Sequence, residues 1–159
     1  MRRLEFFQFV PAKLNLVWDF FSSPANLAKI TPPEMGFIIT SPEQPLMYPG
    51  MFITYKVSPV LGIKMNWVTE ITQVQEHKFF IDEQRSGPYR LWHHEHHFKE
   101  LPNGVEMHDI LYYQLPFGFI GNITDYMFVK QKVESIFEFR EKRIDELFPS
   151  TRFGRVQAK

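Results

Sequence analysis

The segment of this chain best suited to metal binding or proton transfer is the sequence HHEHH at residues 93–97. It lies within Arg90–Glu100, whose alternating pattern is typical of a β-strand. Because successive side chains of a strand point to opposite faces, His94 and His96 share one face and the other three residues share the second. An imidazole binds metal ions and also exchanges protons near neutral pH. The pair His94 and His96 is therefore a candidate for either chemistry.

A metal site needs more ligands than these two histidines. On their face of the strand, the sequence would have to supply Asp109 or Glu70 as a further ligand. On the opposite face, His93 and His97 could combine with His108, but nothing in the pattern enforces a coordination geometry. We therefore expect neither a metal nor a cofactor, and favour a polar network that includes the two inward histidines.

The register of a hairpin decides what this network contains. Arg90–Glu100 and Val105–Leu115 flank Asn103-Gly104, a strong signal for a two-residue hairpin turn. With Pro102 opposite Val105, Asp109 lies diagonal to His96 and within reach of it. A buried carboxylate needs a partner, which His96 or Arg140 can supply.

Three roles for His94, His96, Asp109 and Arg140 remain open. They can form a structural network that holds a helix against the sheet. They can orient the polar end of a ligand, with Arg140 binding a ligand carboxylate. Finally, His96 and Asp109 can act as a catalytic acid–base pair.

The elements that position these residues follow from periodicity and from Pro and Gly at the joints. We expect an α+β fold in which a curved antiparallel sheet of about six to seven strands surrounds a long C-terminal helix, with two short helices after the first strand. The expected strands are 4–10, 37–40, 51–57, 63–74, 78–85, 90–100 and 105–115, and the expected helices are 13–22, 24–30 and 122–148. Since one helix cannot fill the concave side of such a sheet, a cavity is expected between them.

Composition excludes several functional classes. The 159 residues carry 18 basic and 18 acidic side chains, so the charge balance gives no nucleic-acid footprint. Without cysteine there is no disulfide, zinc finger or cysteine nucleophile. The sequence has no phosphate-binding loop, dinucleotide fingerprint or serine-hydrolase elbow. No apolar run is long enough for a membrane span or signal peptide, so we expect a cytoplasmic protein. The oligomeric state stays open, with a homodimer as one option.

Aromatic residues are unusually frequent, at 16% of the chain including 17 Phe. Such a chain either packs an aromatic core or lines a cavity with rings. The segment 117–121, which is apolar and contains two glycines, is either a gate to that cavity or a packed connection. We expect one domain over residues 1–149 and a flexible tail over 150–159.

An ordered set of short motifs resembles a known superfamily. The motifs are PANL at 24–27, TPP at 31–33, PGM at 49–51, FIDEQ at 80–84, GPY at 87–89, WxHxHxF at 92–98, MxDxLxYxLPFG at 107–118 and IFxFR at 136–140. In this order they resemble the SRPBCC (START-like, helix-grip) superfamily, and in particular its polyketide cyclase/dehydrase-like ligand-binding members. The resemblance implies a helix-grip cavity for a small hydrophobic molecule such as a lipid or polyketide. It implies no particular reaction, because fold does not settle function.

We therefore predict a protein that binds a small hydrophobic ligand in an internal cavity. The predicted ligand-binding residues are Trp67, Asp82, Gln84, Trp92, His94, His96, Phe98, Asp109, Leu111, Tyr113, Phe137 and Arg140, with His96 and Asp109 also as catalytic candidates. The alternative is a cyclase, dehydrase or isomerase that uses the His–Asp pair. A protein-interaction module is a third option.

Overall fold

A computed structural model describes residues 1–58, 63–116 and 124–149, with side chains described for all of these except 124–127. The predicted gate at 117–121 and the predicted tail at 150–159 lie outside the described residues. Within the described ranges the predicted order of strands and helices is confirmed, and the fold is α+β with a helix-grip arrangement.

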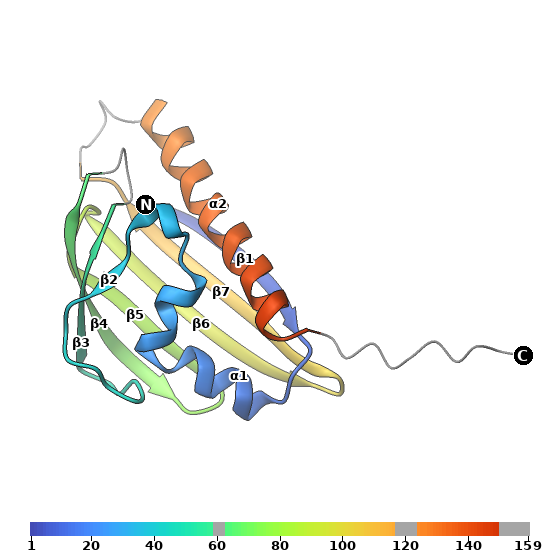
Figure 1. The fold of residues 1–159 in the computed structure, drawn as a ribbon. Helices are drawn as coiled ribbons and strands as arrows, with labels where there is room; N and C mark the ends of the chain where they lie inside the picture. The colour runs from blue at the N-terminus through green and yellow to red at the C-terminus, as the bar shows by residue number, and fades with distance from the viewer. Residues whose placement is uncertain (59–62, 117–123, 150–159) are drawn as a thin grey trace, which may run out of the picture.

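In the described part of the chain, seven antiparallel strands form one curved sheet (Figure 1). The strands are β1 (Arg2–Val10), β2 (Ile38–Ile39), β3 (Met51–Val57), β4 (Met65–Gln75), β5 (Phe79–Ser86), β6 (Leu91–Leu101) and β7 (Gly104–Gln114). Their order across the sheet is β1-β7-β6-β5-β4-β3-β2, a meander closed by β1 against β7. From β2 to β7 consecutive strands are neighbours, whereas β1 and β2 lie at opposite edges; β5 is the central strand, and β6 and β7 follow it in order toward β1.

The turn between β6 and β7 is displaced by one residue from the predicted one, which shifts the pairing register of the two strands by two residues. Leu101 pairs with Gly104, so the loop consists of Pro102 and Asn103 instead of Asn103 and Gly104. Proline has no backbone N–H for the ladder, and its fixed φ suits the first position of a turn. The shift places His96 directly opposite Asp109, where the sequence analysis expected a diagonal pair.

A shift of two residues leaves the faces unchanged, because strand side chains alternate with a period of two. His94, His96, Phe98 and Asp109 are all buried on the inward face, as predicted. The outer face of the same two strands is partly exposed and carries the remaining histidines of the hairpin.

The helices lie along the concave side of the sheet. They are α1 (Leu14–Phe21), the short 3-10 helices η1 (Pro24–Ile30) and η2 (Pro33–Met35), and α2 (Thr124–Leu147). Figure 1 shows α2 running along the side of the sheet formed by β1 and β7, with η1 in front of the central strands. Pro24 at the start of η1 fits the known preference of proline for a first helical position. η2 was not predicted, because the sequence analysis ended the helical region at the prolines at 32 and 33.

The buried apolar residues of the described chain form separate clusters. One cluster joins α1 to β6 and β7 around Trp18, Phe98 and Met107. A second joins α2 to β7 through Leu111, Tyr113, Val133 and Phe137. Two smaller clusters lie on β3 and β4, around Trp67 and around Ile53. No helix in the described parts of the chain is long and apolar enough to cross a membrane.

Candidate functional site

A cavity of about 150 Å³ lies between the sheet and the helices. The residues that line it are Phe20, Phe21, Ser23, Asn26, Leu27, Ile30, Thr31, Met35, Phe37, Met47, Ile53, Tyr55, Val57, Trp67, Thr69, Ile71, Phe80, Asp82, Tyr89, Trp92, His94, His96, Ile136 and Arg140. Most of these side chains are apolar or aromatic. The cavity therefore has the character of a small-molecule site, in which a few polar groups stand within an apolar wall.

Strand alternation builds most of this wall. On β3 the inward residues Ile53, Tyr55 and Val57 line the cavity, and the facing strand β4 adds Trp67 and Thr69. The hydroxyl groups of Tyr55 and Thr69 bond to each other at 2.9 Å. This pair is satisfied, and burial raises the pKa of Tyr55 well above its usual value, so its phenol stays neutral.

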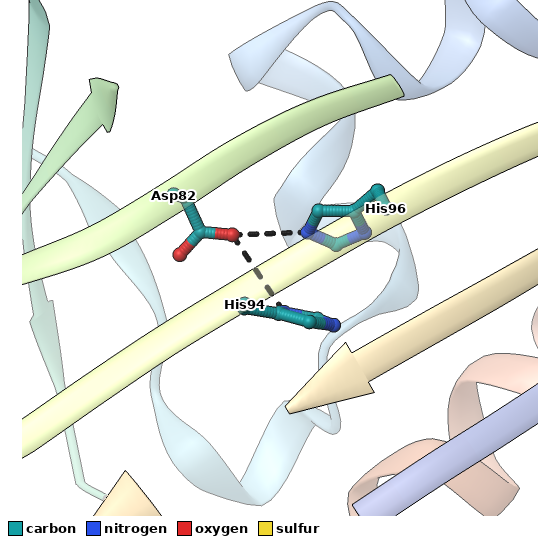
Figure 2. Close-up of side chains that lie close together, drawn as sticks. All are labelled: Asp82, His94 and His96. Atoms are coloured by element: carbon teal, nitrogen blue, oxygen red, sulfur yellow. Dashed lines mark hydrogen bonds and ion pairs between the residues drawn. The ribbon is translucent and has the colours of Figure 1, made fainter. Parts of the chain in front are cut away.

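The polar part of the wall consists of Asp82 on β5 and the histidines His94 and His96 on β6 (Figure 2). His94 lies directly opposite Asp82 in the sheet. Asp82 Oδ2 is 2.9 Å from His96 Nε2, a hydrogen bond, and 3.6 Å from His94 Nδ1. The two imidazole rings have centroids 3.8 Å apart, so one carboxylate oxygen faces both rings from the same side.

Asp109 on β7 faces the same two rings from the other side. Its Oδ1 is 2.7 Å from His96 Nδ1 and 3.1 Å from His94 Nε2. These are ion-pair distances without the alignment of a hydrogen bond. Arg140 Nη1 on α2 lies 3.9 Å from the same oxygen. Each histidine is thus held between two carboxylates, and Arg140 adds positive charge behind Asp109.

This environment shifts the pKa values of the two histidines in opposite directions. Burial lowers the pKa of His94, and the neighbouring His96 lowers it further. Burial would also lower the pKa of His96, but the carboxylates of Asp109 and Asp82 raise it above its usual value. A proton in this cluster therefore resides on His96.

Both carboxylates are ionised in this cluster. Burial acts to raise the pKa of Asp82, but the hydrogen bond from His96 and the nearby positive charges bring it below its usual value. Burial likewise acts to raise the pKa of Asp109, but the charge of His96 and the contacts with both imidazoles leave it well below the usual range.

Besides the imidazole nitrogens that face Asp109, two side chains of the cavity wall carry buried donors without a hydrogen-bond partner in the described part of the chain. These donors are Nε and Nη1 of Arg140 and Nε1 of Trp67. A buried donor without a partner costs about 1–3 kcal/mol, and such groups are rare in native proteins.

The structure brings six of the twelve predicted ligand-binding residues to the cavity wall. They are Trp67, Asp82, Trp92, His94, His96 and Arg140. Asp109 and Phe137 instead border a second hollow between β1 and α2, where Phe137 stacks on Phe6.

The other four predicted residues do not line this cavity. Phe98, Leu111 and Tyr113 pack in the apolar clusters. Gln84 supports a turn, since its side-chain amide donates to the carbonyl oxygen of Tyr89 at 2.6 Å and accepts from the backbone N–H of that residue at 3.2 Å. Inward orientation alone did not separate core residues from cavity residues.

The cavity residues that precede β4 were not predicted from the sequence. Leu27 and Ile30 of η1, Met35 of η2, and Ile53 and Tyr55 of β3 all line the cavity. The alternation in β3 was visible in the sequence and could have identified Ile53 and Tyr55. For the η1 and η2 residues no comparable signal exists, because short 3-10 helices lack a clear apolar stripe.

Among the described residues, one group has the composition of a metal site. Ligand atoms of Asp82, His94 and His96 all lie within 4.8 Å of one another. The sequence had suggested Asp82 only as a cavity residue and not as a metal ligand, and the structure brings it directly beside the two histidines.

Comparison with known structures supports the fold. The chain is similar to protein Ms6760 from Mycobacterium smegmatis, with 18% identity, a TM-score of 0.66 and coverage of 91% of this chain and 89% of that one. It is similar to TTHA0849 from Thermus thermophilus, with 16% identity, a TM-score of 0.65 and coverage of 92% and 99%. It is also similar to Ara h 8.0201, with 12% identity, a TM-score of 0.60 and coverage of 91% and 98%.

No protein-family model and no curated protein matches the sequence. Identities this low show a shared fold and leave the site to be argued from its own residues.

Proposed function

We propose that this protein binds a small, largely apolar molecule in the cavity between its sheet and helices. The observation that carries the proposal is the set of buried polar groups on one wall of an otherwise apolar cavity. The apolar wall would supply the affinity, and Arg140, Trp67 and the Asp82–histidine cluster would orient the polar end of the ligand. The SRPBCC-like resemblance of the sequence implies a ligand in this cavity, and the proposal names the side chains that would hold it.

The cavity volume limits the size of the ligand. An apolar cavity of about 150 Å³ in another protein accommodates a benzene molecule. At the same volume, this cavity suits a compact molecule such as a single substituted ring. A longer lipid or polyketide chain would need the wall to open.

The charges of the cluster favour a neutral polar end over an anionic one. The carboxylates of Asp82 and Asp109 already surround the two histidines, so an anionic ligand group would add a further negative charge beside them. A hydroxyl or carbonyl group can accept from Arg140 or Trp67 without adding a buried charge.

The geometry favours binding over acid–base catalysis. Both ring nitrogens of His96 face a carboxylate, Nδ1 toward Asp109 and Nε2 toward Asp82. A general base needs a nitrogen within reach of the substrate proton. In this arrangement the pair holds the polar wall in place, and we expect no turnover of a bound molecule.

The direct test is native mass spectrometry of protein purified without metal-affinity steps, followed by extraction under denaturing conditions. A defined organic molecule in the extract supports the proposal and gives its chemistry. A titration with p-cresol, followed by ligand-observed NMR, tests the cavity independently. We expect saturable binding of one p-cresol per chain.

Two variants of β3 provide a matched comparison. Ile53 is buried and lines the cavity, whereas the adjacent Phe52 is 54% exposed on the opposite face. Ile53→Trp should fill the cavity and abolish p-cresol binding, while Phe52→Trp should leave it unchanged. Binding that persists in folded Ile53→Trp protein would place the molecule elsewhere and refute the proposal.

A further inference from the structure

We propose that the cluster of Asp82, His94 and His96 binds a divalent first-row transition-metal ion, with Asp82 Oδ2, His94 Nδ1 and His96 Nε2 as ligands. This inference goes beyond the proposed function, because metal binding here needs no organic ligand. It shares the polar wall of the cavity with that function, and the tests below separate the two.

Two of the three distances between the ligand atoms are close to those of a coordination sphere. With metal–ligand bonds of about 2.0–2.1 Å, neighbouring ligand atoms lie about 2.9–3.4 Å apart. Asp82 Oδ2 is 2.9 Å from His96 Nε2 and 3.6 Å from His94 Nδ1. All three ligand atoms lie within 4.8 Å of one another, so a bound ion requires side-chain rotations that bring the two imidazole nitrogens into the same sphere. Figure 2 shows the carboxylate of Asp82 directed at both rings.

Asp109 occupies the position expected of an outer carboxylate. Histidines that bind a metal through one ring nitrogen usually direct the other toward a carboxylate or carbonyl, which fixes the ring and its tautomer. Here the remaining nitrogens, His94 Nε2 and His96 Nδ1, lie 3.1 Å and 2.7 Å from Asp109 Oδ1. One carboxylate oxygen thus lies close to the second ring nitrogen of both proposed ligands, and Arg140 Nη1 lies 3.9 Å from it.

Carboxylates approach the two imidazoles from both sides. Asp82 Oδ2 and Asp109 Oδ1 each lie within 3.6 Å of a nitrogen of both rings. The guanidinium of Arg140 lies farther away, 3.9 Å from Asp109 Oδ1. A metal ion between Asp82 and the two histidines would place positive charge beside these carboxylates.

The donor set selects the class of ion. Two imidazoles and one carboxylate suit zinc, iron, cobalt or manganese, whereas calcium and magnesium prefer oxygen ligands throughout. Three protein ligands leave at least one coordination position open. Because all three residues line the cavity, that position would face it.

The test is a calorimetric titration of the purified, chelator-treated protein with Zn²⁺, together with an absorption spectrum after addition of Co²⁺. We expect one Zn²⁺ per chain and cobalt d–d bands typical of nitrogen and oxygen ligands. Asp82→Asn and His94→Ala should each weaken Zn²⁺ binding at least about 100-fold, and Asp109→Asn about 10–100-fold.

The outer face supplies the control. His97 and His108 lie on neighbouring strands of the same hairpin but on its outer face, with ring centroids 6.2 Å apart. The double variant His97→Ala/His108→Ala removes this second group of imidazoles, and we expect it to keep full Zn²⁺ affinity.

Two results would overturn the inference. One is the absence of saturable Zn²⁺ binding by the wild-type protein at one equivalent. The other is binding that survives in Asp82→Asn and His94→Ala but is lost in the outer-face variant. If Zn²⁺ fails while p-cresol still binds, the metal site is refuted and the proposed function stands. If Zn²⁺ binds but p-cresol does not, the proposed function is refuted and the metal site stands.

Discussion

The substitution Asp109→Asn tests whether the buried carboxylate holds the site together. Asparagine keeps the shape of the side chain and removes its charge. In the wild-type protein Asp109 is 5% exposed, contacts His96 and His94 at 2.7 and 3.1 Å, and lies 3.9 Å from Arg140. The variant leaves Arg140 and the proton on His96 without this counter-charge in a buried environment.

The magnitude follows from the distances. Two unit charges 3.9 Å apart attract by about 4 kcal/mol at an effective dielectric constant of about 20. The desolvation that the native pair already bears is not recovered when one partner is removed, so breaking a buried pair costs about 3–5 kcal/mol. We expect Asp109→Asn to lose about 3 kcal/mol of unfolding free energy. With a urea m-value of about 2 kcal/mol/M, the midpoint falls by about 1.5 M.

Urea unfolding followed by circular dichroism measures this loss, and Glu106→Gln is the matched control. Glu106 lies on the same strand but on the outer face, where its carboxylate is 42% exposed and 3.5 Å from Lys99. Exposed pairs contribute about 0–1 kcal/mol, so its midpoint should fall by less than about 0.5 M. Equal midpoints for the two variants would refute the claim that Asp109 is a buried, charge-balancing group.

A double-mutant cycle identifies the partner. Arg140→Met removes the guanidinium while keeping much of the side-chain volume. The double variant Asp109→Asn/Arg140→Met should lose less free energy than the sum of the single variants, by about 1 kcal/mol or more. Additive losses would mean that Asp109 is stabilised by the histidines alone.

Three further predictions concern stability and specificity. Gly104→Ala should lower the unfolding midpoint strongly, because its new Cβ would collide with the carbonyl oxygen of Val10, and a thermal melt would show the loss. Leu111→Ala, at a site with 0% exposure beneath α2, should cost about 2–5 kcal/mol in urea unfolding. Gln84→Ala should lower the free energy of unfolding by about 1–3 kcal/mol, because the backbone of Tyr89 loses its hydrogen bonds. Calorimetry should find the Zn²⁺ affinity unchanged, since Gln84 bonds to Tyr89 and to none of the proposed ligands.

The metal hypothesis changes how the histidine-rich segment is understood. From the sequence, a network without metal was favoured, because a metal site on the face of His94 and His96 would have had to recruit Asp109 or Glu70. Asp82 supplies a third ligand from β5, directly opposite His94 in the sheet. The sequence spacing of Asp82 and His94 does not by itself indicate that the two residues pair across neighbouring strands.

The sequence by itself determined the fold class and the faces of the strands. A period of two in β6 and β7 fixes which side chains point inward, and it does so even when the predicted hairpin register is wrong by two residues. The burial of His94, His96 and Asp109 therefore followed from local pattern alone.

Only the tertiary structure decided which inward residues meet at the site. The curvature of the sheet and the path of α2 set apart the cavity wall, where Trp67 and Asp82 lie, from the packed core that holds Leu111 and Tyr113. An inward side chain belongs to the core if another element packs against it, and to the cavity wall if none does. The packing element is often remote in sequence. Alternation specifies the direction of a side chain but carries no information about what stands opposite it across the concave side of the sheet.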